Sequence, residues 1–229
     1  MRITLTPFQQ QPSYASPLIQ AGSVDTALKD PFKLPQKPRF LVWDCMLTME
    51  LAKATCAFRG MHFVEQVRHM RYVILPATLL SEIYYSHEMS PGKFVTPDGV
   101  APAEIKMGEM NISNIAMCLR QMICYKQIMD YFKNTELTYE ELVLLRATIF
   151  HFPGSIFLSA YKVLEQHIRK KLGESAVQRR IKELNKLAVR MFEIADHMKM
   201  LHLDFHIKFG NRMFDFPVFE SIIVMHFDF

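Results

Sequence analysis

The sequence predicts an all-α protein, and three observations lead to this prediction. Among its 229 residues glycine is scarce, with 8, whereas methionine and phenylalanine are frequent, with 16 and 18. Few glycines together with many long apolar side chains favour helices. Apolar residues recur at spacings of three and four, the period of an amphipathic helix, and no convincing series of strands is visible. We therefore expect a layered helical domain with at most a short β-hairpin.

The first helical stripe begins at Phe40 and runs through Leu41, Cys45, Thr48, Ala52 and Cys56. A second helix is predicted from about Val64 to Tyr85. Pro76 lies inside this second helix, and a proline in a helix interior costs about 3 kcal/mol and kinks or breaks the helix. The prolines and glycine of the stretch Pro91–Pro102 indicate turns, with a short hairpin at most.

The second half of the chain is predicted to be helical as well. Residues 105–132 are Met-rich and mainly helical in pattern. Thr138 followed by Glu141 is typical of a capping box, and it precedes an apolar helix over residues 142–152 that ends at Pro153-Gly154. The remaining predicted elements are a helix over 158–172, a long helix over 176–208 ended by Gly210-Asn211, and a short helix within the apolar tail 216–229.

Composition separates two regions. Residues 1–38 contain six of the twelve prolines and a run of three glutamines, so we predict a flexible leader or hinge there and a folded domain over residues 39–229. The net charge of +4 is too small to indicate nucleic acid or membrane by itself. No apolar run of transmembrane length and no signal-peptide core is visible in the sequence.

The cysteines and histidines give little support for a metal or a catalytic centre. None of the four cysteines (Cys45, Cys56, Cys118 and Cys124) forms a CxxC pair, so we expect free thiols in a reducing compartment. His197, His202 and His206 have helical spacing that can chelate zinc, but a core histidine is the simpler interpretation. No nucleotide-binding or nucleophile motif occurs. We therefore expect neither an enzyme nor a cofactor, and keep a metal-dependent helical enzyme as the third hypothesis.

A basic cluster lies within residues 162–190, which carry nine lysines and arginines against three glutamates. A nucleic-acid face is one interpretation. Only Tyr161, at the edge of the cluster, offers an aromatic platform. A solvated helix face or a subunit contact therefore explains the cluster better than nucleic acid.

The segment that begins at Ala52 and Lys53 has a recognisable pattern. It reads AKATCAFRGM, and three residues later it continues as EQVRHMR up to Arg71. This resembles the signature of nuclear receptor ligand-binding domains, in which an Ala-Lys pair on the third helix is followed by a Phe five residues on and by an acidic-Gln pair that opens the next helix. The spacing from Lys53 to Arg71 matches the retinoid X type of receptor without a gap.

Three further segments agree with the same family in order. Residues 140–150 resemble its eighth helix, and Arg179-Arg180 with the helix after them resemble its tenth. His202, Gly210, Asp215 and Glu220 fall at the spacing of its end and of the terminal activation helix. Pro97-Asp98-Gly99 is similar to the divergent nematode members. The resemblance covers about residues 39–229, and departs from the family at Pro76, Pro217 and Ser221 and in having no DNA-binding domain.

The resemblance implies a groove for short helices of coregulator proteins with an LxxLL pattern. Lys53 and Glu220 would lie at its two ends, because an ammonium favours the C-terminal carbonyls of a docked helix and a carboxylate favours its N-terminal N–H groups. Val67, Met70 and Arg71 would line the groove. Glu141 and Arg180 would form a structural ion pair between the eighth and tenth helices.

The resemblance also implies a pocket for a small lipophilic ligand, and a packed interior remains an equal alternative. The candidate lining residues are Leu41, Asp44, Cys45, Thr48, Ile74, Thr78 and His202, with Asp44 and His202 as polar anchors. The implied function is a ligand- or conformation-gated regulator of transcription in the nucleus, with the cytoplasm as a second location. The alternative is a ligand-independent module that forms a homodimer or heterodimer with another nuclear receptor and titrates it. We expect no direct nucleic-acid binding and no membrane.

Overall fold

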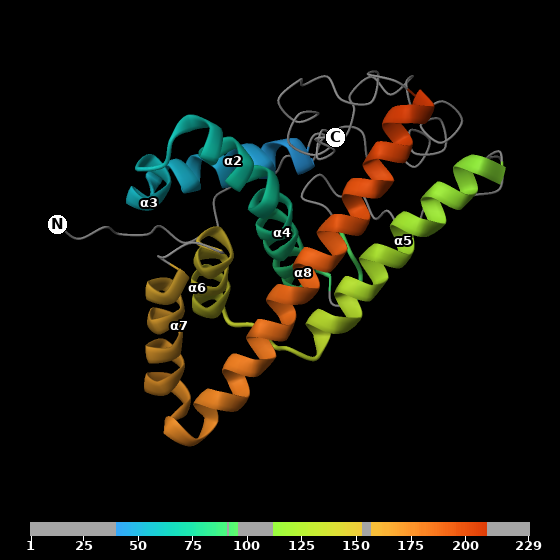
Figure 1. Cartoon of the computed structure of the whole chain (residues 1–229). Helices are drawn as coiled ribbons and strands as arrows, with labels where there is room; N and C mark the ends of the chain where they lie inside the picture. Colours follow the sequence, from blue (N-terminus) through green and yellow to red (C-terminus); the bar gives the residue numbers. More distant parts are fainter. Residues whose placement is uncertain (1–39, 91, 96–111, 153–156, 210–229) are drawn as a thin grey trace.

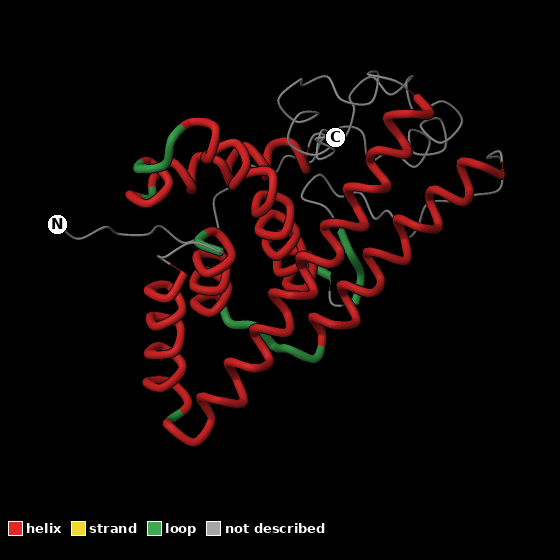
Figure 2. Tube along the Cα trace, viewed as in Figure 1, coloured by secondary structure: helices red, strands yellow, loops and turns green. Residues whose placement is uncertain are grey.

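The computed structural model describes residues 40–90, 92–95, 112–152 and 157–209. These residues are almost entirely helical and contain no strand, so the all-α prediction is confirmed for them (Figures 1 and 2). Of the predicted hairpin region only residues 92–95 are described. The predicted leader, the apolar tail and the predicted site residue Glu220 lie outside the described residues. The helices are α2 (Phe40–Ala54), α3 (Cys56–Arg59), α4 (Phe63–Met89), α5 (Ile112–Lys133), α6 (Tyr139–Phe150), α7 (Phe157–Leu172) and α8 (Glu174–Phe209).

The first predicted stripe is divided between two helices. Helix α2 ends at Ala54, because the side chain of Thr55 starts the short helix α3. The Thr55 hydroxyl donates to the carbonyl of Ala52 at 2.8 Å and accepts from the N–H of Phe58 at 3.4 Å. A threonine in extended conformation is a favourable N-cap. The apolar spacing therefore predicted the helix correctly and its continuation to Cys56 incorrectly.

Of the two effects predicted for Pro76 in the second helix, a kink or a break, the break does not occur. The helix is continuous over 27 residues, with Pro76 in its interior. Twelve of its residues are buried, including the run from Val73 to Leu80, so burial of this apolar surface offsets the roughly 3 kcal/mol that an internal proline costs. A capping box between His62 and Glu65 fixes the start of the helix.

Helices α6, α7 and α8 begin close to their predicted positions, whereas α5 begins at Ile112 and the predicted start at residue 105 lies outside the described residues. The capping box of α6 is confirmed, since the Thr138 hydroxyl accepts from the N–H of Glu141 and the Glu141 carboxylate accepts from the N–H of Thr138. Gly173 separates α7 from α8 with a φ of +83°, a conformation that glycine adopts without strain. Helix α8 extends over 36 residues.

Helix α4 lies at the centre of the described fold. It contacts α2, α5, α6 and α8, while α7 packs on α6 and α8 (Figure 1). Helices α5 and α8 lie side by side along much of their length. The core is continuous through these contacts, and its largest fully buried side chains come from α4, α5, α6 and α7. The nuclear receptor resemblance implies a particular packing of helices, and these contacts are the observations with which that packing must agree.

We predict that Thr138→Ala destabilises the protein by about 1 kcal/mol, because the first turn of α6 loses its capping hydroxyl. The free energy of unfolding in urea, followed by circular dichroism, measures this effect. Ser159→Ala in α7 removes another exposed hydroxyl and serves as the control, with an expected change below about 0.5 kcal/mol. Equal effects of the two substitutions would contradict the capping role.

Candidate functional site

Three of the predicted ligand residues form one buried polar cluster between α2 and α4. The hydroxyl oxygens of Thr48 and Thr78 lie 3.2 Å apart, and the Thr78 hydroxyl donates to the sulfur of Cys45 at 3.7 Å. All three side chains are buried. Burial raises the pKa of the Cys45 thiol far above its usual range, because the thiolate would lose its hydration. Burial therefore favours the neutral thiol of Cys45, which packs in the core between α2 and α4.

Arg146 of α6 completes this polar cluster, and the sequence analysis did not single it out. Its guanidinium donates to the Thr48 hydroxyl at 2.9 Å and lies 5.9 Å from the centre of the Phe150 ring. Burial lowers the pKa of Arg146, and the nearby charge of Asp44 acts in the opposite direction. The signal in the sequence was a single charged residue inside the apolar run of residues 142–152.

The other predicted ligand residues take different positions. Asp44 is half-buried, Ile74 is fully buried in α4, and the side chain of Leu41 lies outside what the structure describes. His202 is buried on α8, where loss of hydration lowers the pKa of its imidazole to about 4. His202 is therefore neutral at physiological pH.

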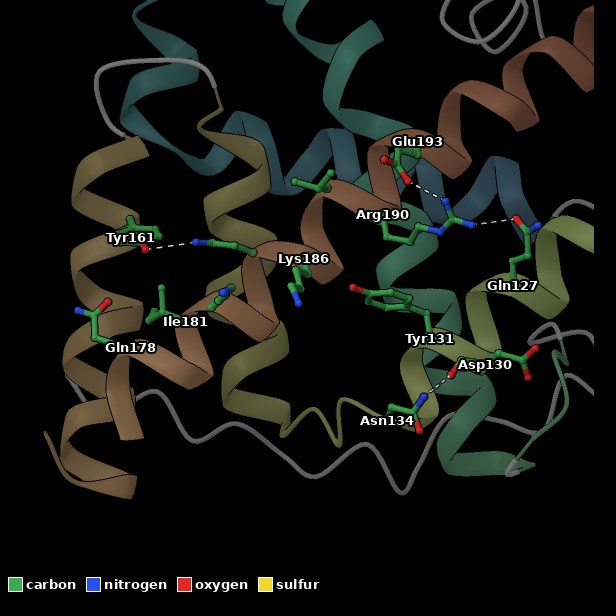
Figure 3. A pocket seen from close by; sticks show the side chains of 13 residues that line it. Gln127, Asp130, Tyr131, Asn134, Tyr161, Gln178, Ile181, Lys186, Arg190 and Glu193 are labelled. Carbon is green, nitrogen blue, oxygen red and sulfur yellow. Dashed lines mark hydrogen bonds and ion pairs between the residues drawn. The ribbon is translucent and has the colours of Figure 1, made fainter. Parts of the chain in front are cut away.

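Two surface hollows lie away from these predicted ligand residues. The larger, of about 1150 Å³, is an open groove along α8 between α5 and α7 (Figure 3). Its side chains are mostly polar, and Arg190 there donates to Glu193 at 2.7 Å and to Gln127 at 3.0 Å. The second, of about 450 Å³, lies beside the connection from α5 to α6. Neither hollow is lined by any of the seven predicted ligand residues.

The predicted coregulator residues that the structure describes lie near the end of α2 and along α4. Lys53 is exposed near the end of α2 and pairs with Glu50 one turn earlier. Phe63, Val67 and Arg71 follow at four-residue spacing, so they lie along one face of α4. Phe63 is 72% exposed, Val67 and Arg71 are half-buried, and Met70 is buried. Met70, which was predicted to line the groove, belongs to the hydrophobic core. We call Lys53, Phe63, Val67 and Arg71 the docking surface.

Gln66 holds this docking surface in shape. Its side-chain amide donates to the backbone carbonyl of Phe58 at 2.9 Å and to that of Met61 at 3.2 Å. These two carbonyls belong to the chain between α2 and α4. The hydrogen bonds therefore fix the end of α3 against the first turn of α4. The sequence analysis used Gln66 only as part of the family pattern, and the structure gives it this role.

The predicted ion pair between Glu141 and Arg180 is present in the structure. Two guanidinium nitrogens of Arg180 donate to the two carboxylate oxygens of Glu141, at 2.7 and 2.6 Å. Arg180 also donates to the backbone carbonyls of Thr135 and Glu136. The side chains are 13% and 5% exposed for Arg180 and Glu141. Burial alone would raise the pKa of Glu141, but hydrogen bonds from Arg180 and Thr138 and the guanidinium charge outweigh it and lower the pKa.

The histidines proposed for a metal do not converge among the described side chains. His197 is exposed and His202 is buried, and the side chain of His206 is outside the described set. Within the described residues no group of three or more histidine, cysteine or acidic side chains could hold a metal ion. Among the same residues, no helix combines the length and the apolar character needed to cross a bilayer.

Comparisons with known proteins add no relative. The chain matches no protein-family model, and a search of curated proteins finds no match either. Over the residues that it describes, the structure defines an all-helical arrangement centred on α4.

We predict that Glu141→Gln lowers the free energy of unfolding at neutral pH by about 3 kcal/mol, because Arg180 keeps a buried charge without its main partner. The pKa of Glu141 is lower in the folded than in the unfolded chain, so its contribution is fully present above the ordinary carboxyl value and is lost as the pH falls through the folded value. The difference between wild type and Glu141→Gln should therefore shrink in acid. Urea unfolding at several pH values measures it.

Glu183→Gln is the matched control for this measurement. Glu183 is a second acidic partner of Arg180, at 3.1 Å, but its side chain is 46% exposed. Exposed ion pairs contribute about 0–1 kcal/mol. A loss as large as that of Glu141→Gln, or a Glu141→Gln effect that does not change with pH, would contradict the importance of the buried pair.

Proposed function

We propose that this protein is a regulatory module of the nuclear receptor ligand-binding type that recruits a short amphipathic helix of a coregulator. The observation that supports the proposal is the docking surface, which combines exposed Phe63 and half-buried Val67 of α4 with exposed Lys53 near the end of α2. Apolar anchors at helical spacing, next to a charge, are what an amphipathic helix requires in a receiving groove.

Lys53 is the proposed polar contact for the C-terminal end of the docked helix. A docked helix ends with backbone carbonyls that have no partner within the helix, and an ammonium is favourable there. Lys53 has only an exposed partner, Glu50, in the described structure, and such a pair is weak and easily exchanged for a ligand. The family pattern assigns the opposite end to Glu220. The same pattern supplies the proposed nuclear location and the role in transcription.

A small lipophilic ligand enters the proposal from the resemblance. The candidate residues Cys45, Thr48, Ile74 and Thr78 are all buried, and the Thr78 hydroxyl contacts both Thr48 and Cys45. A conformation-gated surface with a packed interior is therefore the form of the proposal that the geometry favours. A ligand would have to separate α2 from α4 or occupy space bounded by other residues.

Dimerisation is the second candidate function, and the exposed face of α8 favours it. Val189 and Met200 are exposed apolar residues on this helix, and they lie among charged side chains. The groove in Figure 3 runs along the same helix and leaves this face open. A long helix with an exposed face of mixed character is typical of a polar, exchangeable interface between two proteins.

We predict that Lys53→Glu weakens binding of a fluorescein-labelled LxxLL peptide at least tenfold, because a carboxylate then faces the C-terminal carbonyls of the peptide helix. Fluorescence polarisation with purified protein measures the affinity. Lys162→Glu reverses another exposed lysine, on α7, and should leave the affinity unchanged. Equal affinities of wild type and Lys53→Glu would contradict the role of Lys53, and no binding by wild type would contradict the docking function.

We predict that native mass spectrometry of the purified chain shows no lipid-sized adduct, because the candidate ligand side chains pack against one another. The same sample in denaturing solvent provides the control, since a non-covalent adduct disappears there. A stoichiometric mass that solvent extraction recovers as a lipid would contradict the packed interior and make ligand gating the primary function.

A further inference from the structure

We propose that the groove along α8 binds an extended acidic peptide segment of a partner protein. The segment carries acidic side chains at two alternate positions and an apolar side chain two positions further on. The groove has a volume of about 1150 Å³ and lies open between α5 and α7 (Figure 3). The inference goes beyond coregulator recruitment at the docking surface, because it concerns other residues and a peptide without helical structure.

Two lysines of the groove are cations without an acidic partner in the described structure. Each of the three glutamates in the basic cluster of residues 162–190 pairs with an arginine, in the pairs Glu165–Arg169, Glu174–Arg169 and Glu183–Arg180. Lys182 and Lys186 of α8 line the groove and are exposed, and among the described residues neither forms an ion pair. These two ammonium groups can therefore receive carboxylates of a partner without breaking a pair within the chain.

The spacing of these lysines matches an extended peptide. Lys182 and Lys186 are four positions apart, about 6 Å along the helix at 1.5 Å per residue. In an extended chain, alternate side chains lie on the same side and are about 6.6 Å apart. The next side chain on that side reaches the turn that contains Val189 and Arg190, about 4.5–6 Å beyond Lys186. Val189 is 58% exposed, so an apolar side chain there gains burial.

Amide side chains on the walls of the groove suit the backbone of such a peptide. Asn134 donates to the backbone carbonyl of Asp130 at 3.2 Å, and Asn185 donates to the Tyr161 hydroxyl at 3.3 Å. Each of these bonds orients the amide and uses one of its two N–H hydrogens, so a hydrogen and the carboxamide oxygen remain for a ligand. An extended backbone offers both N–H and C=O groups, whereas a helix already bonds most of its own. The groove therefore favours an extended segment over a helix.

A nucleic-acid strand fits this groove less well than a peptide. Asp130 and Glu193 also line the groove, and phosphates would be repelled by their carboxylates. A phosphate backbone offers acceptors to the amides and no donors for their oxygens. The same two carboxylates can accept from peptide N–H groups, and the existing bond from Arg190 to Glu193 leaves acceptor positions free.

Fluorescence polarisation with a labelled peptide tests the binding. The probe is a nine-residue peptide with aspartate, aspartate and leucine at its third, fifth and seventh positions and serine or glycine elsewhere. Wild type should bind it saturably at low ionic strength. Lys182→Glu and Lys186→Glu should each weaken binding about tenfold, because repulsion replaces attraction. Lys170→Glu is the matched control: it reverses an exposed lysine of the same cluster outside the groove and should bind like wild type.

Changes in the peptide test the register independently of net charge. A peptide with the two aspartates next to each other has the same charge and should bind about fivefold more weakly, because only one of two adjacent side chains faces the groove. Val189→Ser should weaken binding of the leucine peptide and leave a peptide with serine at the seventh position unchanged. Circular dichroism and urea unfolding of each variant should match wild type, since all the substituted side chains are exposed.

The outcomes separate this inference from its alternatives. No saturable binding by wild type, or an equal loss in Lys170→Glu, overturns the peptide site. Tighter binding of a labelled single-stranded oligonucleotide than of the peptide assigns the cluster to nucleic acid and overturns it as well. A dimer in analytical ultracentrifugation that Lys182→Glu dissociates, in a chain that binds no peptide, assigns the groove to a second copy. Loss in both groove variants with retained binding by Lys170→Glu, and with unchanged affinity for the LxxLL peptide, supports the proposal.

Discussion

The guanidinium of Arg180 joins three helices of this protein at one point. It binds both carboxylate oxygens of Glu141 at the start of α6 and the backbone carbonyls of Thr135 and Glu136, which follow α5. Glu136 has a positive φ of 43°, a strained conformation for a residue with a side chain. The hydrogen bond from Arg180 to its carbonyl offsets that strain. The direction in which α6 leaves α5, and the position of both relative to α8, depend on this side chain.

The sequence predicted the helices better than their boundaries. Spacing of apolar residues located α4 and α8, and Thr138 with Glu141 located the start of α6, because both signals are local. No local signal in the sequence predicts that α4 continues through Pro76, because this continuity depends on burial of Val73–Leu80 by α2, α5, α6 and α8. Thr55 ended α2 early because a single hydroxyl can cap a new helix. A propensity rule cannot weigh such tertiary contributions.

The candidate site was also predicted only where the sequence carries a signal, and missed where tertiary packing decides. Thr48 and Thr78 were expected to line one ligand pocket, and in the structure their hydroxyls contact each other directly. Whether a cavity surrounds these two residues depends on the volumes of side chains from several helices. The spacing of apolar residues does not specify these volumes. Arg146 was missed because a charge within an apolar run suggests an exposed residue, whereas its partner Thr48 is 98 positions away. The Glu141–Arg180 pair came from the family pattern and not from any rule of spacing.

An aromatic cluster connects the two proposed surfaces. Tyr72 follows Arg71 of the docking surface, and its ring centre lies 5.1 Å from that of Phe192 on α8 and 6.2 Å from that of Phe152. Phe152 and Phe192 are also in contact, at 5.6 Å. Phe192 precedes Glu193, which lines the groove along the exposed face of α8. Packed rings do not deform continuously, so a rotation of α8 in a dimer would have to move Tyr72 or break this cluster. One packed aromatic cluster therefore links the helix that carries the docking surface to the exposed face of α8.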